Sequence, residues 1–141
     1  MERVVRELAL REPMTVSPDM PYTELVHLFV AGHLDDVVVV NENESVVGTI
    51  SPNDLLRATD QACDDEVDVG EPAKLEDRFA ALKAKEIASP DVVWIPLDMP
   101  VREVARRMRD EGLHRVLVGD DDGDLAGLLT AFDVLAQIVP S

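Results

Sequence analysis

The residues best suited to chemistry form one short pattern that this sequence contains twice, as "GTISPNDLL" and again as "GLLTAFDVL". In each copy a hydroxyl residue, Ser51 or Thr130, follows a glycine by three positions and precedes an aspartate, Asp54 or Asp133, by three positions. A hydroxyl and an acid at this spacing are typical of a helix N-terminal capping box, where both side chains accept main-chain N–H groups. The pattern therefore predicts two helix starts.

The same pattern could also hold a nucleotide. The N-terminus of a helix is a favourable binding site for phosphate, because its free N–H groups point at the ligand. A carboxylate one turn into the helix can accept both hydroxyls of a ribose, as an acid does in dinucleotide-binding folds. Capping and nucleotide binding use the same geometry, so the pattern leaves both functions open. The glycine before each hydroxyl indicates that the end of the strand must permit a close approach.

Other candidate sites are weaker. "DDDGD" (120–124) lacks the acid spacing of an EF-hand and fits a hairpin turn with Asp-Gly better than a calcium site. The histidines, which are His27, His33 and His114, are not at metal-ligand spacing. The single cysteine, Cys63, can form neither an internal disulfide nor a cysteine metal cluster. Because no nucleophile and base stand out, we expect no catalytic activity and no metal.

The two patterns end two copies of one longer unit. With an offset of 79 residues, 6–56 aligns with 85–135 without a gap, and 12 of the 51 positions are identical. Each copy predicts a short extended piece, a helix after "DMP", a buried strand, a hairpin turn, a second strand and a final short helix. We expect an α/β (α+β) fold in which two β-α-β-β-α repeats pack sheet to sheet as a single module over 1–141. Between them, 57–84 is predicted as a linker with an acidic loop, followed by a helix over 75–88 that leads into the second copy.

The tandem copies, the β-α-β-β-α order and the ending G-h-h-[ST]-x-x-D resemble a pair of cystathionine-β-synthase-type (CBS) domains, a Bateman module. The resemblance covers both copies and leaves only the linker and the termini. It implies a regulatory module that binds an adenosine-containing ligand, such as AMP, ADP, ATP or S-adenosylmethionine, in clefts between the copies and signals to a partner protein. The ligand would be regulatory and not a catalytic cofactor. CBS pairs also resemble one another in dimerising through their helices, which implies a homodimer.

The resemblance also implies roles for residues of both copies. The motif aspartates would hold ribose hydroxyls, and the motif hydroxyls and one basic residue would face phosphate; these are Asp54, Asp133, Ser51, Thr130 and Arg115. The opening strand of each copy would line the adenine, with Thr15, Val16 and Ser17 in the first and Trp94, Ile95 and Pro96 in the second.

The two copies differ in charge at these positions. Where the second copy has Arg115, the first has Asp36, which would repel phosphate. We therefore expect a phosphorylated adenosine ligand to occupy first the site with Asp133, Thr130 and Arg115, and Trp94 to lie near the adenine. The surrounding negative charge favours AMP, ADP or the cationic S-adenosylmethionine over a triphosphate at low salt.

The overall charge limits the partners. The formal net charge is −16, with 29 acidic and 13 basic residues, which disfavours nucleic acid and anionic membranes. Abundant aspartate with only three lysines is typical of salt-accumulating organisms, although an acidic protein from an ordinary GC-rich bacterium would fit too. The charged start "MERVVRELALREP" has no signal-peptide core, so we expect a cytoplasmic protein.

The sequence leaves two alternatives to a ligand-binding regulator. A ligand-free dimerisation or adaptor module would keep the fold and use Ser51 and Thr130 only as helix caps. An enzyme is the less favoured alternative, since no acid–base pair stands out. For a homodimer we expect the first copy's helices at the interface, because Leu28, Val30 and Ala31 form an apolar face away from the predicted core.

Overall fold

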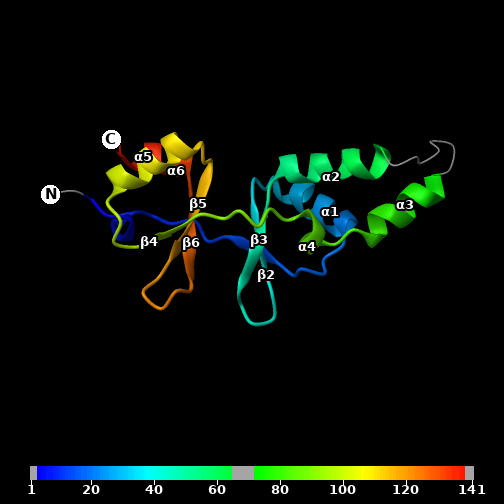
Figure 1. The fold of residues 1–141 in the computed structure, drawn as a ribbon, viewed down its shortest axis with the longest axis horizontal. Helices are drawn as coiled ribbons and strands as arrows, with labels where there is room; N and C mark the ends of the chain where they lie inside the picture. Colours follow the sequence, from blue (N-terminus) through cyan, green and yellow to red (C-terminus); the bar gives the residue numbers. More distant parts are fainter. Residues whose placement is uncertain (1–2, 65–71, 139–141) are drawn as a thin grey trace. The chain divides into compact units, whose positions relative to one another are not determined.

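The computed structural model describes residues 3–64 and 72–138, and the chain divides into two compact units. Met14–Asp91 form one of them, which we call the repeat-one unit. Met1–Pro13 together with Val92–Ser141 form the other, the repeat-two unit. The N-terminal segment, drawn in dark blue, therefore belongs to the unit built mainly from the second repeat (Figure 1). Within the described ranges, no helix has both the length and the apolar character needed to cross a membrane.

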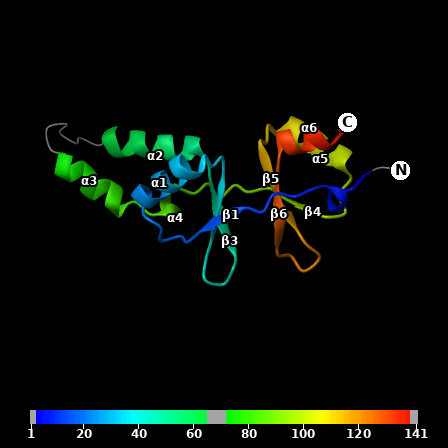
Figure 2. The ribbon, with the colours of Figure 1, turned by 180° about the vertical axis from the view of Figure 1, so that it is seen from behind.

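The repeat-one unit follows the predicted order of elements. The repeat consists of β1 (Met14–Val16), α1 (Tyr22–Gly32), β2 (Val37–Val40), β3 (Val46–Ile50) and α2 (Pro52–Asp64). Its three-stranded sheet has the order β1-β2-β3, with β1 parallel to β2 and β2 antiparallel to β3. Within this unit the helices all lie on one side of the sheet (Figure 2).

The start of the linker is helical, and the prediction of a loop there is wrong. α2 continues to Asp64, whereas the later part of the expected loop, 65–71, lies outside the described residues. Contacts between helices explain the difference, because the hydroxyls of Tyr22 and Thr59 share a hydrogen bond that ties α2 to α1. Such tertiary contacts override a polar local sequence.

The helix expected over 75–88 is instead two helices, α3 (Pro72–Ala81) and α4 (Ala84–Ile87). The interruption has a physical cause, since the chain at the break pairs with the chain before α1. Lys83, between the two helices, forms an antiparallel bridge with Pro21, and the N–H of Ala84, the first residue of α4, donates to the Met20 carbonyl oxygen at 2.8 Å. These bonds replace the helical ones that a continuous helix would make.

The repeat-two unit repeats the same order after a short N-terminal 3-10 turn. Its elements are η1 (Val5–Glu7), β4 (Trp94–Pro96), α5 (Val101–Glu111), β5 (Arg115–Gly119), β6 (Leu125–Thr130) and α6 (Ala131–Ile138). The sheet has the order β4-β5-β6, again with one parallel and one antiparallel pair. The predicted mixed α/β class, with two three-stranded sheets, is confirmed.

Each unit has its own hydrophobic core, made by its strands and the inner faces of its helices. The helical spacing predicted from the sequence is confirmed: the buried positions are Tyr22, Leu25 and Phe29 in α1 and Val101, Val104 and Met108 in α5. The expectation for Leu28 is wrong, because this residue packs against the repeat-one core. The core that Leu28 joins also includes Phe79 of α3, whose ring stacks on Tyr22 with ring centroids 4.8 Å apart. Val30 remains 70% exposed.

A segment from elsewhere in the same unit pairs with the outer strand of each sheet. We call residues 8–11 the N-terminal strap and residues 88–90 the linker strap. In the repeat-two unit, Arg11 and Leu128 exchange main-chain hydrogen bonds of 3.0 and 2.9 Å. In the repeat-one unit, Thr49 and Ser89 exchange bonds of 3.0 and 2.9 Å. The straps therefore occupy the same place in the two units.

The straps explain the glycine of the repeated pattern. A Cβ atom placed on Gly127 would lie 2.6 Å from Leu10 Cβ, and one placed on Gly48 would lie 2.5 Å from the Ser89 carbonyl oxygen. Atoms cannot approach so closely without displacement of the strap. The predicted close approach at the end of the strand is confirmed.

Candidate functional site

Both copies of the pattern form a capping box. Ser51 N–H donates to Asp54 Oδ2 at 2.9 Å, its hydroxyl donates to the same oxygen at 3.0 Å, and Asp54 N–H donates to Ser51 Oγ at 3.2 Å. At the start of α6, Thr130 N–H donates to Asp133 Oδ2 at 3.0 Å, and Asp133 N–H donates to Thr130 Oγ1 at 3.2 Å. Both predicted helix starts are confirmed.

The two carboxylates have different cationic neighbours. The Asp54 side chain is 8% exposed, and Arg57 of the same helix reaches its Oδ1 at 3.3 Å. The Asp133 side chain is 14% exposed, and Arg11 of the N-terminal strap donates from Nε to Oδ1 at 2.8 Å and to Oδ2 at 2.7 Å. In the alignment of the repeats Arg11 matches Pro90, which has no side-chain donor. Only the second box can therefore receive a cation from a strap in this way.

The environment of Asp133 favours its ionised form. Burial alone would raise the pKa of Asp133, but hydrogen bonds from Thr130 and from Arg11 outweigh it and hold the pKa below its ordinary value. The carboxylate is therefore ionised at neutral pH, where it acts only as a hydrogen-bond acceptor. Such a group is suited to receive hydroxyl groups of a ligand.

Three of the residues predicted for the second site lie together within the repeat-two unit. Arg115 begins β5 and pairs in register with Thr130, which ends β6 and starts the capping box of Asp133. Trp94 of β4 pairs with Leu117, which lies two positions after Arg115 in β5. Trp94 is 38% exposed. Its Cε3 lies 3.5 Å from the position a Cβ atom would take on Gly119, at the hairpin end of the sheet. Within this unit, Trp94 therefore lies away from the capping box.

The other residues of the second opening strand differ in exposure. Ile95 is 2% exposed and belongs to the repeat-two core, so that only its main chain could face a ligand. Pro96 is exposed and pairs with Gly119. The strand thus offers few side chains for recognition.

In the repeat-one unit, the first opening strand also lies apart from its capping box. Thr15 and Ser17 are exposed and Val16 is buried in the core. These three residues line an open hollow of about 680 Å³, together with Lys85 and the turn after β2. The hollow lies at the carboxyl ends of β1 and β2, whereas Ser51 follows the antiparallel β3 and lies at the other end of the sheet.

Sequence reasoning missed Arg11. The bond between Arg11 and Asp133 joins residues that are 122 positions apart in the chain. The one signal in the sequence is that the repeat aligns Arg11 with Pro90. That contrast shows a difference between the copies, but it does not show that the N-terminal segment folds onto the second repeat.

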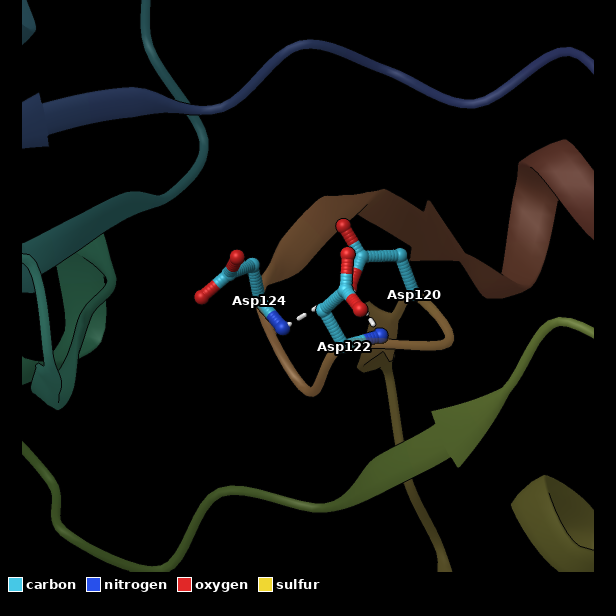
Figure 3. Close-up of side chains that lie close together, drawn as sticks. All are labelled: Asp120, Asp122 and Asp124. Atoms are coloured by element: carbon cyan, nitrogen blue, oxygen red, sulfur yellow. Dashed lines mark hydrogen bonds between the residues drawn. The ribbon is translucent and has the colours of Figure 1, made fainter.

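The acidic turn between β5 and β6 closes on the side chain of Asp120, as Figure 3 shows. Asp120 Oδ1 accepts the N–H groups of Asp122 and Asp124, both at 2.9 Å. In the matching turn of the first repeat, Asn41 Oδ1 accepts two N–H groups at 2.9 and 3.0 Å. Because an uncharged amide makes the same bonds, turn closure explains the acid at position 120. The predicted hairpin turn is confirmed.

The remaining candidates do not gather into a site. His33 ends α1 in the left-handed conformation, with a φ angle of 49°. His27, His114 and Cys63 are exposed. In the part of the chain that the structure describes, the three aspartates of the acidic turn are the one group of three or more potential metal-ligating side chains.

Comparison with known families decides the relationship of this chain. The profile of the CBS domain matches residues 5–60 and again 84–140, which together make up most of the chain. The chain belongs to the CBS domain family. Each CBS match includes one of the two capping boxes.

A relative of this CBS protein occurs in an archaeon. The uncharacterized protein MK0525 of Methanopyrus kandleri is 31% identical over 136 residues. The alignment covers 96% of the chain but only 62% of the relative. The chain therefore spans less than two thirds of that relative's length.

Solved CBS structures share the fold. The structure of CBSX2 in complex with AMP has a TM-score of 0.74 at 22% identity, over 96% of this chain and 95% of that one. The CBS domain pair of protein MJ0100, in complex with 5′-methylthioadenosine and S-adenosyl-L-methionine, has a TM-score of 0.73 at 20% identity, over 98% of this chain and 97% of that one. At such identities the likeness concerns the fold.

Proposed function

We propose that this chain is a regulatory module that binds an adenosine-containing ligand at the capping box of α6 and signals to a partner protein. The observation that carries this proposal is the arrangement of charge around the box. An ionised carboxylate, Asp133, lies at a helix N-terminus, with Arg11 bonded to it and Arg115 on the strand beside it. Carboxylates accept ribose hydroxyls, and arginines bind phosphate through several N–H donors.

Family membership supports the class of ligand. One structure with this fold holds AMP, and another holds 5′-methylthioadenosine and S-adenosylmethionine. These three compounds share an adenosine and differ in the group attached to the 5′ carbon. The candidate ligands are therefore AMP, ADP, ATP and S-adenosylmethionine.

Each side chain of the box has a role in the proposal. Asp133 accepts the ribose hydroxyls, while the Thr130 N–H continues to hold its Oδ2. Arg115 and the positive, N-terminal end of the α6 dipole attract the phosphate. The adenine contacts expected for the opening strands stay predictions; the residues concerned are Thr15, Val16, Ser17, Trp94, Ile95 and Pro96.

The capping box of α2 is proposed as the weaker site for a phosphorylated ligand. Ser51 and Asp54 offer the same hydroxyl and carboxylate as the box of α6. However, Asp36 directly precedes β2 at the position where Arg115 begins β5. A negative charge near a phosphate weakens its binding. A phosphorylated ligand should therefore occupy the Asp133 box first.

A thermal-shift panel tests the proposal. AMP, ADP, ATP and S-adenosylmethionine are added separately to the wild-type protein, with GMP as the control for adenine. A ligand present at 100 times its Kd stabilises the folded protein by about 2.7 kcal/mol. For a domain of this size, that stabilisation raises the melting temperature by several degrees. We expect at least one adenosine compound to raise the melting temperature more than GMP does. If none does so at millimolar concentration, the proposal is wrong.

A ligand-free dimerisation or adaptor module is the second candidate function. The capping boxes themselves favour it, because each hydroxyl and carboxylate already caps its helix through bonds within the chain. In this alternative, replacing Asp133 lowers stability, but no adenosine compound shifts the melting temperature of the wild type. The ligand panel therefore separates the two functions.

We also propose a homodimer that uses the helices of the repeat-one unit. Val30 and Ala31 are exposed on α1, and exposed apolar side chains favour a partner surface. Light scattering at micromolar concentration in molar salt should give twice the mass of the 15.5 kDa chain. A monomeric mass would contradict the proposal. The cytoplasmic location and the lack of catalysis stay predictions.

A further inference from the structure

Arg11 is anchored to β6 by its main chain, independently of its side chain. Its N–H and C=O groups both pair with Leu128. The Gln137 side chain holds the neighbouring Ala9, accepting its N–H at 2.7 Å and donating to its carbonyl oxygen at 3.2 Å. The Arg11 side chain is 55% exposed. The guanidinium can therefore move while the strap remains on α6 and β6.

The bond that Arg11 makes competes with a ribose. Its Nε bridges both oxygens of Asp133, and Oδ2 also accepts the Thr130 N–H. The two hydroxyls of a ribose would need the same carboxylate as their acceptor. A ribose that takes both oxygens must therefore displace the guanidinium, at least in part.

We infer that Arg11 makes ligand binding at Asp133 depend on an anionic group in the ligand, an inference that rests on the proposed adenosine site. A phosphate offers the displaced guanidinium a new partner, so that Asp133 is released to the ribose without leaving Arg11 unpaired. Arginine is suited to this exchange, because its planar guanidinium presents five N–H donors and Nε supplies only one of them. An uncharged nucleoside breaks the ion pair and offers the guanidinium no anionic acceptor in return. A cationic ligand is in addition repelled by Arg11 and Arg115.

The capping box of α2 lacks this device. Arg57 contacts only Oδ1 of Asp54, at 3.3 Å, and comes from the same helix. The linker strap has Pro90 at the position of Arg11. The selection for an anionic group is therefore a property of the second repeat alone.

Binding of AMP and of adenosine, measured by isothermal titration calorimetry, tests the inference. The proteins compared are the wild type, Arg11→Ala and Arg11→Gln, with Arg6→Ala as the matched control. Arg6 precedes the same strap, and Arg6→Ala removes the same positive charge. Arg6 pairs with Asp98 and Asp121 at an exposed surface and does not contact Asp133 through those bonds. Arg11→Gln keeps much of the side-chain length and an N–H donor without the charge, and decides the outcome if Arg11→Ala does not fold.

We expect Arg11→Ala and Arg11→Gln to weaken AMP binding about tenfold or more, since a charged hydrogen-bond partner of the phosphate is lost. Adenosine binding should stay the same or become tighter, because the competitor for Asp133 is gone. The preference for AMP over adenosine should then fall by about tenfold or more, and Arg6→Ala should retain it.

Three results overturn the inference, and they are distinguishable. If AMP binds the wild type and the Arg11 variants weaken AMP and adenosine by the same factor, Arg11 only supports the structure, and the proposed adenosine site survives. The same holds if the variants change neither ligand. If neither AMP nor adenosine binds any of the proteins, the inference fails; the proposed function fails with it only if ADP, ATP and S-adenosylmethionine also give no shift in the thermal panel.

Discussion

Asp54 and Asp133 occupy equivalent positions in the two repeats, yet their surroundings differ. Each accepts the N–H of the capping hydroxyl residue three positions earlier. Only Asp133 is bridged by an arginine from a distant segment, and the pKa of this carboxyl lies below its ordinary value. The same helix cap has thus acquired a second electrostatic partner in one repeat. In the proposed function, that difference makes the two boxes unequal as ligand sites.

Asp133 should stabilise the protein in a pH-dependent way. The folded state lowers its pKa, so the folded protein binds this proton less readily than the unfolded chain does. The stabilisation is present above the unfolded-state pKa and is lost as the pH falls through the lower folded-state pKa. Wild type and Asp133→Asn should therefore differ more in melting temperature at about pH 6 than at about pH 3. A difference in melting temperature that grows on acidification would show that folding does not lower the pKa of Asp133.

At the scale of elements, each capping box depends on a strand and a strap as well as on a helix. β6 delivers Thr130 to the start of α6, and the N-terminal strap places Arg11 against Asp133. The strap can lie close to β6 because position 127 has no side chain. The glycine of the repeated pattern is therefore a packing requirement, although it contacts neither the hydroxyl nor the acid.

Gly127→Ala should displace the N-terminal strap and destabilise the protein by about 1–3 kcal/mol. The new methyl group would lie 2.6 Å from Leu10 Cβ and 3.1 Å from the Arg11 carbonyl oxygen. Gly119→Ala is the matched control, because its nearest atom is Trp94 Cε3 at an ordinary 3.5 Å; it should change stability by no more than about 0.5 kcal/mol. Urea unfolding measures both variants. Equal effects at the two glycines would show that the strap tolerates the methyl group.

Much of the fold could be predicted from the repeat, because the hydrophobic spacing of a helix and the β-branched run of a buried strand are local properties. The capping boxes followed in the same way from residues three positions apart. The division of the linker into α3 and α4 could not be predicted, because it depends on bonds such as that from Ala84 to Met20. The pairing of Arg11 with Asp133 and the distance of Trp94 from the box also depend on tertiary packing. Apart from Arg11, the sequence therefore predicted which residues form the candidate site, but it predicted the spatial contacts only within each capping box.

At the scale of the whole molecule, the dominant property is a net charge of −16. Excess negative charge maintains solubility, but the acidic side chains repel one another in the compact state and so destabilise it. Salt screens that repulsion. Many of the ion pairs that the structure describes, such as Arg6–Asp98 and Arg109–Asp110, lie at exposed positions, where such pairs contribute little to stability. The surface is therefore expected to be sensitive to ionic strength.

Thermal unfolding in low and in molar salt should reveal this sensitivity. If the acidic surface is an adaptation to a salt-accumulating cell, the melting temperature should be clearly higher in molar potassium chloride than in dilute buffer. Equal melting temperatures in the two conditions would argue against that adaptation and favour an ordinary acidic protein.

The central claim is that the Asp133 box is the preferred site for a phosphorylated adenosine ligand, and calorimetric titration with AMP tests it most directly. The comparison uses the wild type, Asp133→Asn and Asp54→Asn, since both variants remove one equivalent carboxylate charge and nearly preserve side-chain size. We predict that Asp133→Asn removes the tightest binding event and that Asp54→Asn retains it. Loss of that event in Asp54→Asn, with its retention in Asp133→Asn, would contradict the account.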